Sequence, residues 1–171
     1  MRKSVLFIML MLGVSMAAQA QKFAFIDTEY ILEAIPAYKQ ASEQMDASAQ
    51  KWQSEIEAVA KTAEELYKDY QAKMSSLSES QRKQKEDAII TKEKEVNELK
   101  RAYFGPEGEL YKMREKLLTP INNAIYEAVK ALAEQNGYSA VVDRASASSV
   151  IFASPRIDIS NEVLAKLGYS N

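Results

Sequence analysis

The segment MDASAQKWQSEIEAVAKTAEELYKDYQAKMSSL, residues 45–77, carries apolar side chains at the first and fourth positions of a seven-residue repeat. The stripe positions are Met45, Ala49, Trp52, Ile56, Val59, Ala63, Leu66, Tyr70, Lys73 and Leu77, and Lys73 alone is not apolar. A stripe that repeats about every 3.5 residues keeps one helix in contact with another over a long distance. The segment therefore predicts one rod of a coiled coil, in a protein that holds or spaces something.

A second stripe with the same repeat predicts the partner rod. It consists of Ile89, Val96, Tyr103, Leu110 and Leu117. The serine-rich stretch 75–80 between the two stripes is typical of a turn. Ser78, with Gln81 three residues later, fits a capping box at the start of the return helix. Two rods joined by such a turn must lie antiparallel.

The position of the turn predicts which residues face each other. If the hairpin closes near residues 78–79, opposed positions have numbers that add up to about 157, so Trp52 lies near Gly105. Pro36 suits the first turn of the outgoing helix, which we expect to run from about residue 37 to 76. We therefore predict a helical hairpin, here called the arm, over residues 36–136.

The return rod contains two interruptions. In the stretch 105–108, Gly105 can end one helix and Pro106 can begin the next, while the seven-residue phase continues beyond the break. We expect this break to bend the rod without redirecting it. Thr119-Pro120 is expected to add a second kink, and Asn136-Gly137 to end the helix.

The two chain ends differ in character from the arm. Residues 23–26, 139–143 and 149–153 are short apolar runs that predict strands, and the last two are expected to pair as a hairpin. Short helices are expected from residue 27 or 28 to about 34, and over 162–167. These ends, residues 21–35 and 137–171, are here called the base. Asp143 and Arg144 are expected to form an ion pair at a strand end.

The predicted fold class is therefore mainly α with a small β base, in which a long antiparallel helical hairpin is inserted into a short-stranded oligomerisation domain. Three strands and one short helix make a thin core. Exposed strand edges with apolar faces favour self-association. We therefore expect a symmetric oligomer through the base, with a subunit number that the residues alone do not determine.

Residues 1–20 have the pattern of a secretory signal peptide. Arg2 and Lys3 precede an apolar run, and Ala18-Gln19-Ala20 places small residues where signal peptidase cleaves, so cleavage is expected after Ala20. The alternative is an uncleaved membrane anchor, for which the apolar run is short.

Composition excludes several kinds of chemistry. The chain contains no Cys and no His, so the thiolate nucleophile, the commonest general base and the commonest metal ligand are absent. The formal net charge is −2, whereas a dedicated nucleic-acid binder normally shows a basic patch. Adjacent carboxylates on an exposed helix do not converge on a substrate. We therefore expect no enzyme, no cofactor, no metal site and no nucleic-acid partner.

The order of these segments resembles the Skp/OmpH family of periplasmic chaperones. The resemblance is carried by the strand that begins Phe23-Ala24-Phe25-Ile26-Asp27, by the stretch 137–143 and by the closing stretch 153–164, ASPRIDISNEVL. It implies a homotrimer in which the bases share a β barrel and the arms enclose a cavity. It also implies ATP-independent holding of unfolded outer-membrane β-barrel proteins in the periplasm. The mild acidity and the break at 105–108 depart from the family pattern.

The arm tip, residues 66–95, carries an imbalance of apolar side chains. The outgoing helix contributes five large apolar residues, whereas the facing return stretch has only Ala88, Ile89 and Ile90. The excess is either exposed for client contact or covered by another subunit or a bend. The predicted client-binding residues are Tyr67, Tyr70, Met74 and Leu77. Lysines on the return helix offer contact with anionic lipid headgroups, although interleaved acidic residues largely cancel their charge. A structural coiled-coil spacer of the cell envelope is the alternative function.

Overall fold

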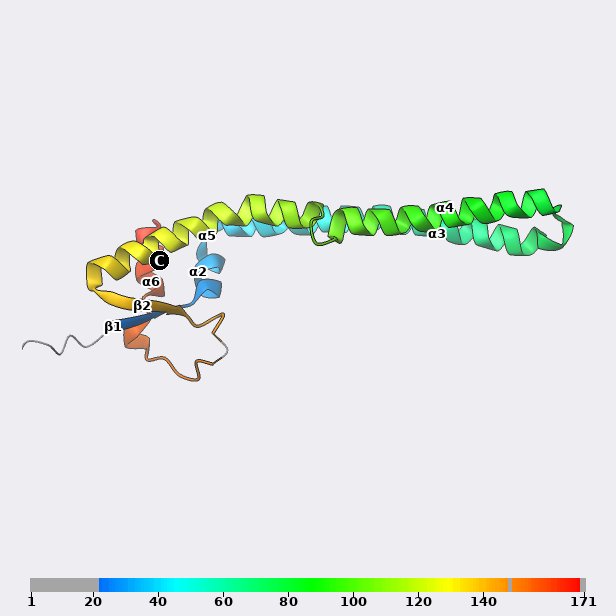
Figure 1. Ribbon diagram of the computed structural model, residues 1–171. Coiled ribbons are helices and arrows are strands. Elements are labelled where there is room, and N and C mark those ends of the chain that lie inside the picture. The colour runs from blue at the N-terminus through cyan, green and yellow to red at the C-terminus, as the bar shows by residue number, and fades with distance from the viewer. Residues whose placement is uncertain (1–21, 148, 170–171) are drawn as a thin grey trace, which may run out of the picture. The chain divides into compact units, whose positions relative to one another are not determined.

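The computed structural model describes residues 22–147 and 149–169, so the predicted signal peptide lies outside the described residues. The elements in chain order are β1 (Lys22–Ile26), α2 (Thr28–Ala34), α3 (Pro36–Lys73), η1 (Met74–Ser76), α4 (Glu79–Phe104), α5 (Glu109–Asn136), β2 (Tyr138–Asp143), η2 (Pro155–Ile157) and α6 (Ser160–Lys166) (Figure 1). The predicted class, mainly helical with a small β part, is confirmed.

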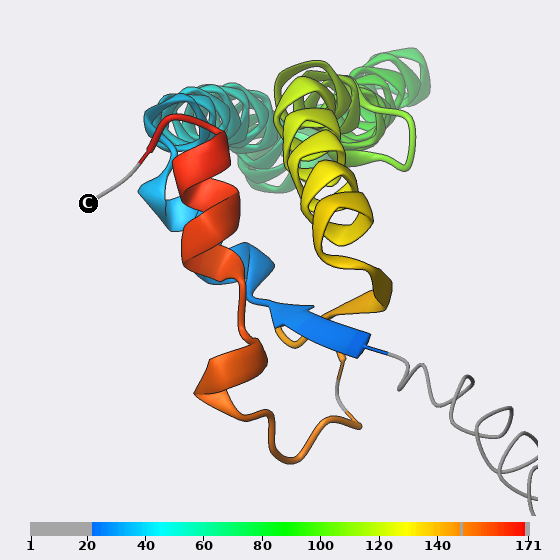
Figure 2. The ribbon, with the colours of Figure 1, turned by 90° about the vertical axis from the view of Figure 1, so that its left-hand side faces the viewer.

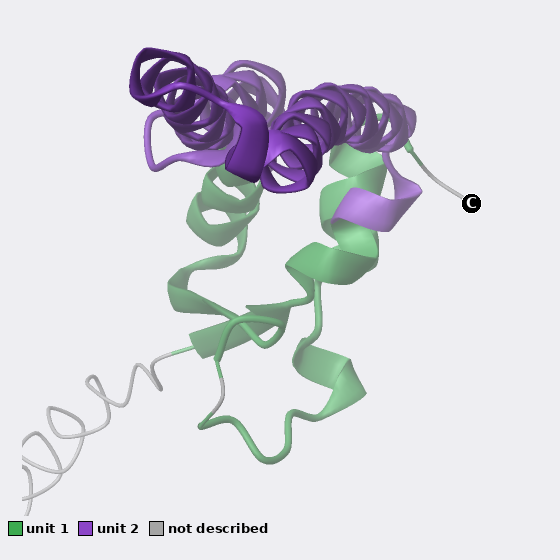
Figure 3. Ribbon diagram, turned by 90° about the vertical axis from the view of Figure 1, so that its right-hand side faces the viewer, with its two compact units in different colours: residues 1–31, 126–171 green, residues 32–125 purple. Residues whose placement is uncertain are grey.

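The chain divides into two compact units, which are coloured separately in Figure 3. Unit 1 combines the described residues up to Ile31 with those from Tyr126 onward, and unit 2 is Leu32–Ile125. The division falls inside α2 and α5, whereas the predicted boundaries of the arm follow helix ends. Among the described residues, none of the helices combines the length and apolar character that a membrane span requires.

In unit 2, α3 and α4 pack side by side as an antiparallel pair (Figure 1). The predicted stripe is the contact face: Ile56 and Ala63 of α3 and Ile89 of α4 are buried, while Lys73 is exposed. Trp52 stacks on Tyr103, with ring centroids 5.1 Å apart. The predicted register is therefore confirmed to within two residues.

The tip of the hairpin closes as its sequence predicts. The Ser78 hydroxyl accepts a hydrogen bond from the backbone N–H of Gln81, and the Gln81 side chain accepts one from the backbone N–H of Ser78. This capping box satisfies two donors at the start of α4. The outgoing α-helix ends at Lys73, three residues earlier than predicted, because Met74–Ser76 tightens into a 3-10 turn.

The predicted break in the return rod is present between α4 and α5. The backbone N–H of Gly105 still donates to the carbonyl of Arg101, at 2.9 Å, and the chain then leaves the helix until Glu109. A Cβ on Gly105 would lie 2.3 Å from that carbonyl oxygen, so the turn requires a residue without a side chain. Pro120, by contrast, lies inside α5 without ending it.

Unit 1 contains a two-stranded sheet in which β1 and β2 run parallel. The register pairs Phe23 with Ala140 and Ile26 with Asp143. On its other edge β1 meets the segment before α6, because the backbone N–H of Ile159 donates to the carbonyl of Phe25 at 2.8 Å. The sheet therefore joins the start of the chain to two segments near its end.

The predicted hairpin between residues 139–143 and 149–153 is wrong. The first run is β2, but its partner is β1, and the described residues of 149–153 form no strand. Arg144 continues the parallel ladder by donating its backbone N–H to Ile26, so the chain does not turn back on β2. Figure 2 shows the 3-10 helix η2, in orange, just before α6, in red. A β-prone composition alone is therefore not sufficient to form a strand.

Candidate functional site

The four predicted client-binding residues lie near the end of α3, η1 and the turn that follows. Tyr67 and Met74 are exposed, at 49% and 47% respectively, whereas Tyr70 and Leu77 are half-buried. The Tyr70 hydroxyl donates to the Glu86 carboxylate on α4, and this hydrogen bond, together with desolvation, raises the pKa of Tyr70. The free apolar surface at the arm tip therefore comes from Tyr67 and Met74, together with Ile90 of α4, which is 59% exposed.

A shallow groove of about 430 Å³ adjoins this surface between α3 and α4. Small side chains on α3 open it, and acidic groups stand on both walls. Its lining residues are Ala60, Ala63, Glu64, Tyr67, Glu93, Val96 and Asn97. Tyr67 therefore lines a depression in the surface between the two helices.

Exposed ion pairs line the arm tip, and one of them joins its two helices. Asp69 contacts Lys73 on its own helix and Lys85 on α4, the latter at 2.5 Å, and these two lysines lower the pKa of Asp69. Glu64 and Lys68 form a further pair along α3. Exposed pairs of this kind contribute little stability each. The Asp69–Lys85 pair is the one of these that connects α3 to α4.

A second groove, which the sequence analysis missed, lies at the break between α4 and α5. It has a volume of about 460 Å³ and is walled by α3 on one side and by the start of α5 on the other. Its lining residues are Tyr38, Ser42, Met45, Asp46, Phe104, Gly105, Pro106, Leu110, Tyr111, Arg114 and Leu118. The sequence carries one sign of this groove, namely the aromatic residues on either side of the Gly105-Pro106 pair. Because the seven-residue phase continues across the break, however, the sequence predicts continuous packing of the two helices.

Aromatic packing fixes the arm beside this groove. Trp52 stacks on Tyr103 with an angle of 10° between the rings, and Phe104 meets Trp52 edge-on with centroids 6.3 Å apart. The Tyr103 hydroxyl donates to Glu55 at 2.8 Å, which raises the pKa of Tyr103. Such pairs add about 0.5–1.5 kcal/mol beyond area burial. The cluster therefore holds α3 and α4 together at the break.

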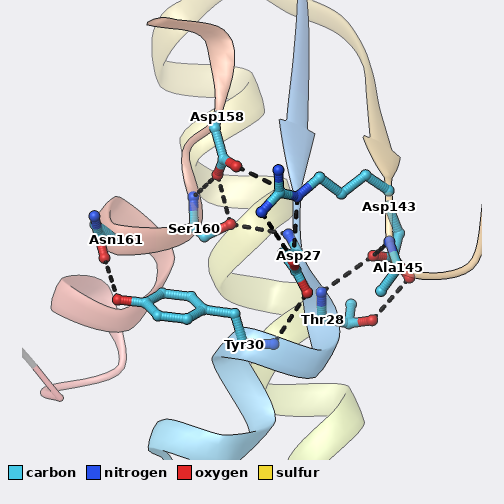
Figure 4. Close-up of polar contacts among 9 residues, drawn as sticks. Asp27, Thr28, Tyr30, Asp143, Ala145, Asp158, Ser160 and Asn161 are labelled. Carbon is cyan, nitrogen blue, oxygen red and sulfur yellow. Dashed lines mark hydrogen bonds and ion pairs between the residues drawn. The ribbon is translucent and has the colours of Figure 1, made fainter. Parts of the chain in front are cut away.

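In unit 1, polar side chains converge where the two strands end (Figure 4). The Asp143 carboxylate accepts hydrogen bonds from the backbone N–H and the hydroxyl of Thr28, at 3.1 and 2.8 Å. Burial alone would raise the pKa of Asp143, but these bonds and one from the N–H of Ala145 lower it. The carboxylate thereby ties the end of β2 to the start of α2.

Arg144 does not pair with Asp143, so that prediction is wrong. Its guanidinium instead contacts Asp27 at 3.0 Å and Asp158 at 3.7 Å. Asp143 already accepts the Thr28 and Ala145 donors, whereas Asp27 and Asp158 lie within reach of the arginine side chain. The three acidic residues and Arg144 come from three separate stretches of the chain, and no local pattern predicts their convergence.

The buried polar side chains of the described residues are satisfied within the protein. No group of three or more Asp or Glu side chains in residues 22–147 and 149–169 is placed to hold a metal ion. In the same part of the chain, every buried side-chain nitrogen or oxygen has a hydrogen-bond partner. The buried polar side chains that converge in unit 1 therefore all have hydrogen-bond partners within the protein.

Comparisons with known proteins agree with this architecture. The family model described as outer membrane protein (OmpH-like) matches residues 22–167. A crystal structure of a putative outer membrane chaperone (OmpH-like) from Caulobacter crescentus CB15 superposes with a TM-score of 0.65 at 14% identity, covering 88% of this chain and 86% of that one. No curated protein sequence matches the chain. The family match spans nearly all described residues, and the chain therefore belongs to the OmpH-like family of outer membrane proteins.

Proposed function

We propose that this protein is a periplasmic holdase, which binds unfolded outer-membrane β-barrel proteins without ATP and keeps them from aggregating before membrane insertion. The observation that carries the proposal is the arm tip, where Tyr67 and Met74 expose about half of their side-chain surface on a helical hairpin. Membership of the OmpH-like family, and the chaperone description of the matching crystal structure, support the same role.

The exposed side chains suit a client that has no fixed shape. Methionine is flexible and polarisable, and tyrosine combines an apolar ring with a hydrogen-bonding hydroxyl. Each contact with an unfolded segment is weak, but many such contacts bind the unfolded state in preference to the native one. Client release then requires only that the client folds, so no nucleotide is needed.

We also propose that the working form is an oligomer assembled through the base, with three copies whose arms enclose the client cavity. Two observations support assembly. Ile151 and Phe152 are exposed by 100% and 80%, and the sheet within the described residues has only two strands. Two strands are marginal alone, and large apolar side chains in water favour contact with another copy.

The proposed location rests on the leader pattern of residues 1–20, with cleavage after Ala20 and a periplasmic product. Contact of the return helix with anionic lipid headgroups stays a prediction. Its lysines are interleaved with glutamates, and Lys92 and Lys94 pair with Glu95 and Glu98 on the same helix. Any attraction to an anionic surface is therefore weak.

The test compares aggregation of a denatured outer-membrane barrel in the presence of residues 21–171 and of single variants. Tyr67→Gln removes the exposed aromatic ring at the arm tip, and Tyr126→Gln removes a more exposed one, at 64%, from α5 as a matched control. Loss of about 1 kcal/mol of client contact raises the concentration needed for half suppression roughly fivefold. We expect this fivefold increase for Tyr67→Gln and a larger increase when Met74→Gln is added. For Tyr126→Gln we expect no change in the concentration needed for half suppression.

Two results would count against the proposal. Suppression by the Tyr67→Gln, Met74→Gln double variant equal to that of the wild type would remove the arm tip from client binding. A wild-type protein that suppresses no aggregation at any concentration would instead favour a structural spacer of the cell envelope.

A further inference from the structure

Four residues in unit 1 form a closed circuit of polar contacts. The backbone N–H of Asp27 donates to the Ser160 hydroxyl at 2.9 Å, and that hydroxyl donates to Asp158 at 2.6 Å. The second carboxylate oxygen of Asp158 faces Arg144, which returns to the Asp27 carboxylate at 3.0 Å. Ser160 is buried, at 4% exposure, so this part of the circuit is shielded from water.

The circuit closes a loop. Arg144 is the first residue of the segment that connects β2 to α6, and Asp158 is the last but one, so their ion pair joins the two ends of this segment. Asp27 anchors both ends to the end of β1, because it contacts Arg144 directly and Asp158 through Ser160. The guanidinium also separates two carboxylates that would otherwise face each other. Arg144 is therefore the residue on which closure of the loop depends most.

One stretch of this loop, residues 145–155, is unlike the rest of the chain. Residues 145–155 contain no charged side chain, although 27% of the whole chain is charged. Within this stretch Ile151 is fully exposed and Phe152 is 80% exposed. A charged surface that meets its own copy brings like charges together, whereas an uncharged apolar surface does not. The composition therefore fits a second copy of this chain better than a partner selected by charge.

We propose that Arg144 is a positioning residue for assembly: by closing the Arg144–Asp158 loop onto Asp27, it holds Ile151 and Phe152 in the conformation that a second copy binds. This inference rests on the proposed assembly through the base. It adds that the contacts of Arg144 position Ile151 and Phe152 for that assembly. Each subunit would form its own loop closure before it meets a partner. Assembly would then be sensitive to changes in the circuit, whose members need not touch the neighbouring subunit.

The test measures self-association of residues 21–171 by sedimentation over a range of concentrations. Arg144→Gln opens the circuit. Arg156→Gln is the matched control, because it removes the same charge from the same loop without touching the circuit. We expect Arg144→Gln to weaken association at least about threefold relative to the control. Asp158→Asn, which retains an oxygen acceptor for Ser160, should weaken association in the same direction.

Hydrogen exchange separates loop closure from general unfolding. In Arg144→Gln, amides of residues 145–157 should exchange faster, while those of α3 and α4 keep wild-type rates. The double variant Arg144→Gln, Asp158→Asn should associate more tightly than Arg144→Gln alone, because it relieves the facing carboxylates.

The outcomes distinguish this inference from the function on which it rests. A wild type that associates, together with Arg144→Gln and Asp158→Asn variants that associate as tightly as Arg156→Gln, would overturn the role of Arg144 alone. A wild type that stays monomeric at all concentrations would overturn the proposed assembly and the inference with it.

Discussion

Replacement of Ile89 and of Ile90 by alanine tests whether the arm is held by the predicted stripe. The two residues are neighbours on α4, but Ile89 is 7% exposed and Ile90 is 59% exposed. Truncation of a buried isoleucine costs about 2–5 kcal/mol, from lost transfer energy and the cavity that remains. The lower part of that range, about 2–3 kcal/mol, is expected for Ile89→Ala because a two-helix arm can close partly over the gap. For Ile90→Ala the change is within about 0.5 kcal/mol, since alanine also has the higher helix propensity.

Trp52 gives this experiment its probe. It is the only tryptophan in the chain, it lies on α3, and it stacks on Tyr103 of the return rod. Urea unfolding followed by tryptophan fluorescence therefore reports separation of the two rods. Equal losses of stability in the two variants would refute the stripe as the contact face, and a loss confined to Ile90→Ala would mean that α4 is rotated about its axis.

Three other substitutions test local features. Ser78→Ala removes the capping box and should lower the unfolding free energy of the arm by about 1 kcal/mol, as measured by urea titration. Ser80→Ala, inside α4, is the control and should not lower it. Equal effects of the two substitutions would contradict the role of the cap. Gly105→Ala forces a Cβ against a carbonyl oxygen and should destabilise the arm by about 1–3 kcal/mol in the same titration, so wild-type stability would contradict the tight turn. The pKa of Asp143 is lowered, so its stabilisation is present above the unfolded pKa of about 3.9 and is lost as pH falls through the folded value. Acid unfolding of unit 1 should therefore depend less on pH in Asp143→Asn, and an unchanged profile would refute this role.

The arm could be predicted from the sequence because its determinants are local and periodic. Each pattern depends only on residues that are close in sequence, and the structure contains the element that each predicts. These patterns are the seven-residue stripe, the capping box at Ser78 and the Gly105-Pro106 break. The count of apolar residues on facing stretches predicts free apolar side chains at Tyr67 and Met74, and both are exposed. A count of apolar residues gives no information about hydrogen bonds, so it could not show that the Tyr70 hydroxyl donates to Glu86.

The base was harder to predict because its contacts join distant segments. The apolar run around Ile151 has the composition of a strand, but β2 pairs with β1, which is more than a hundred residues away in sequence. For the same reason Arg144 was assigned to its neighbour Asp143, whereas its partners are Asp27 and Asp158. Local patterns show which residues can pair, and the tertiary fold determines which of them meet.

The absence of cysteine from the chain allows a direct test of where a client binds. A single cysteine introduced at Met74 or at Glu57, both exposed and both from the outgoing rod, can carry a polarity-sensitive dye. On addition of a urea-denatured outer-membrane barrel, the account predicts a blue-shifted, brighter emission from the dye at position 74 and little change at position 57. An unchanged emission at position 74, while the barrel still stays soluble, would contradict client binding at the arm tip.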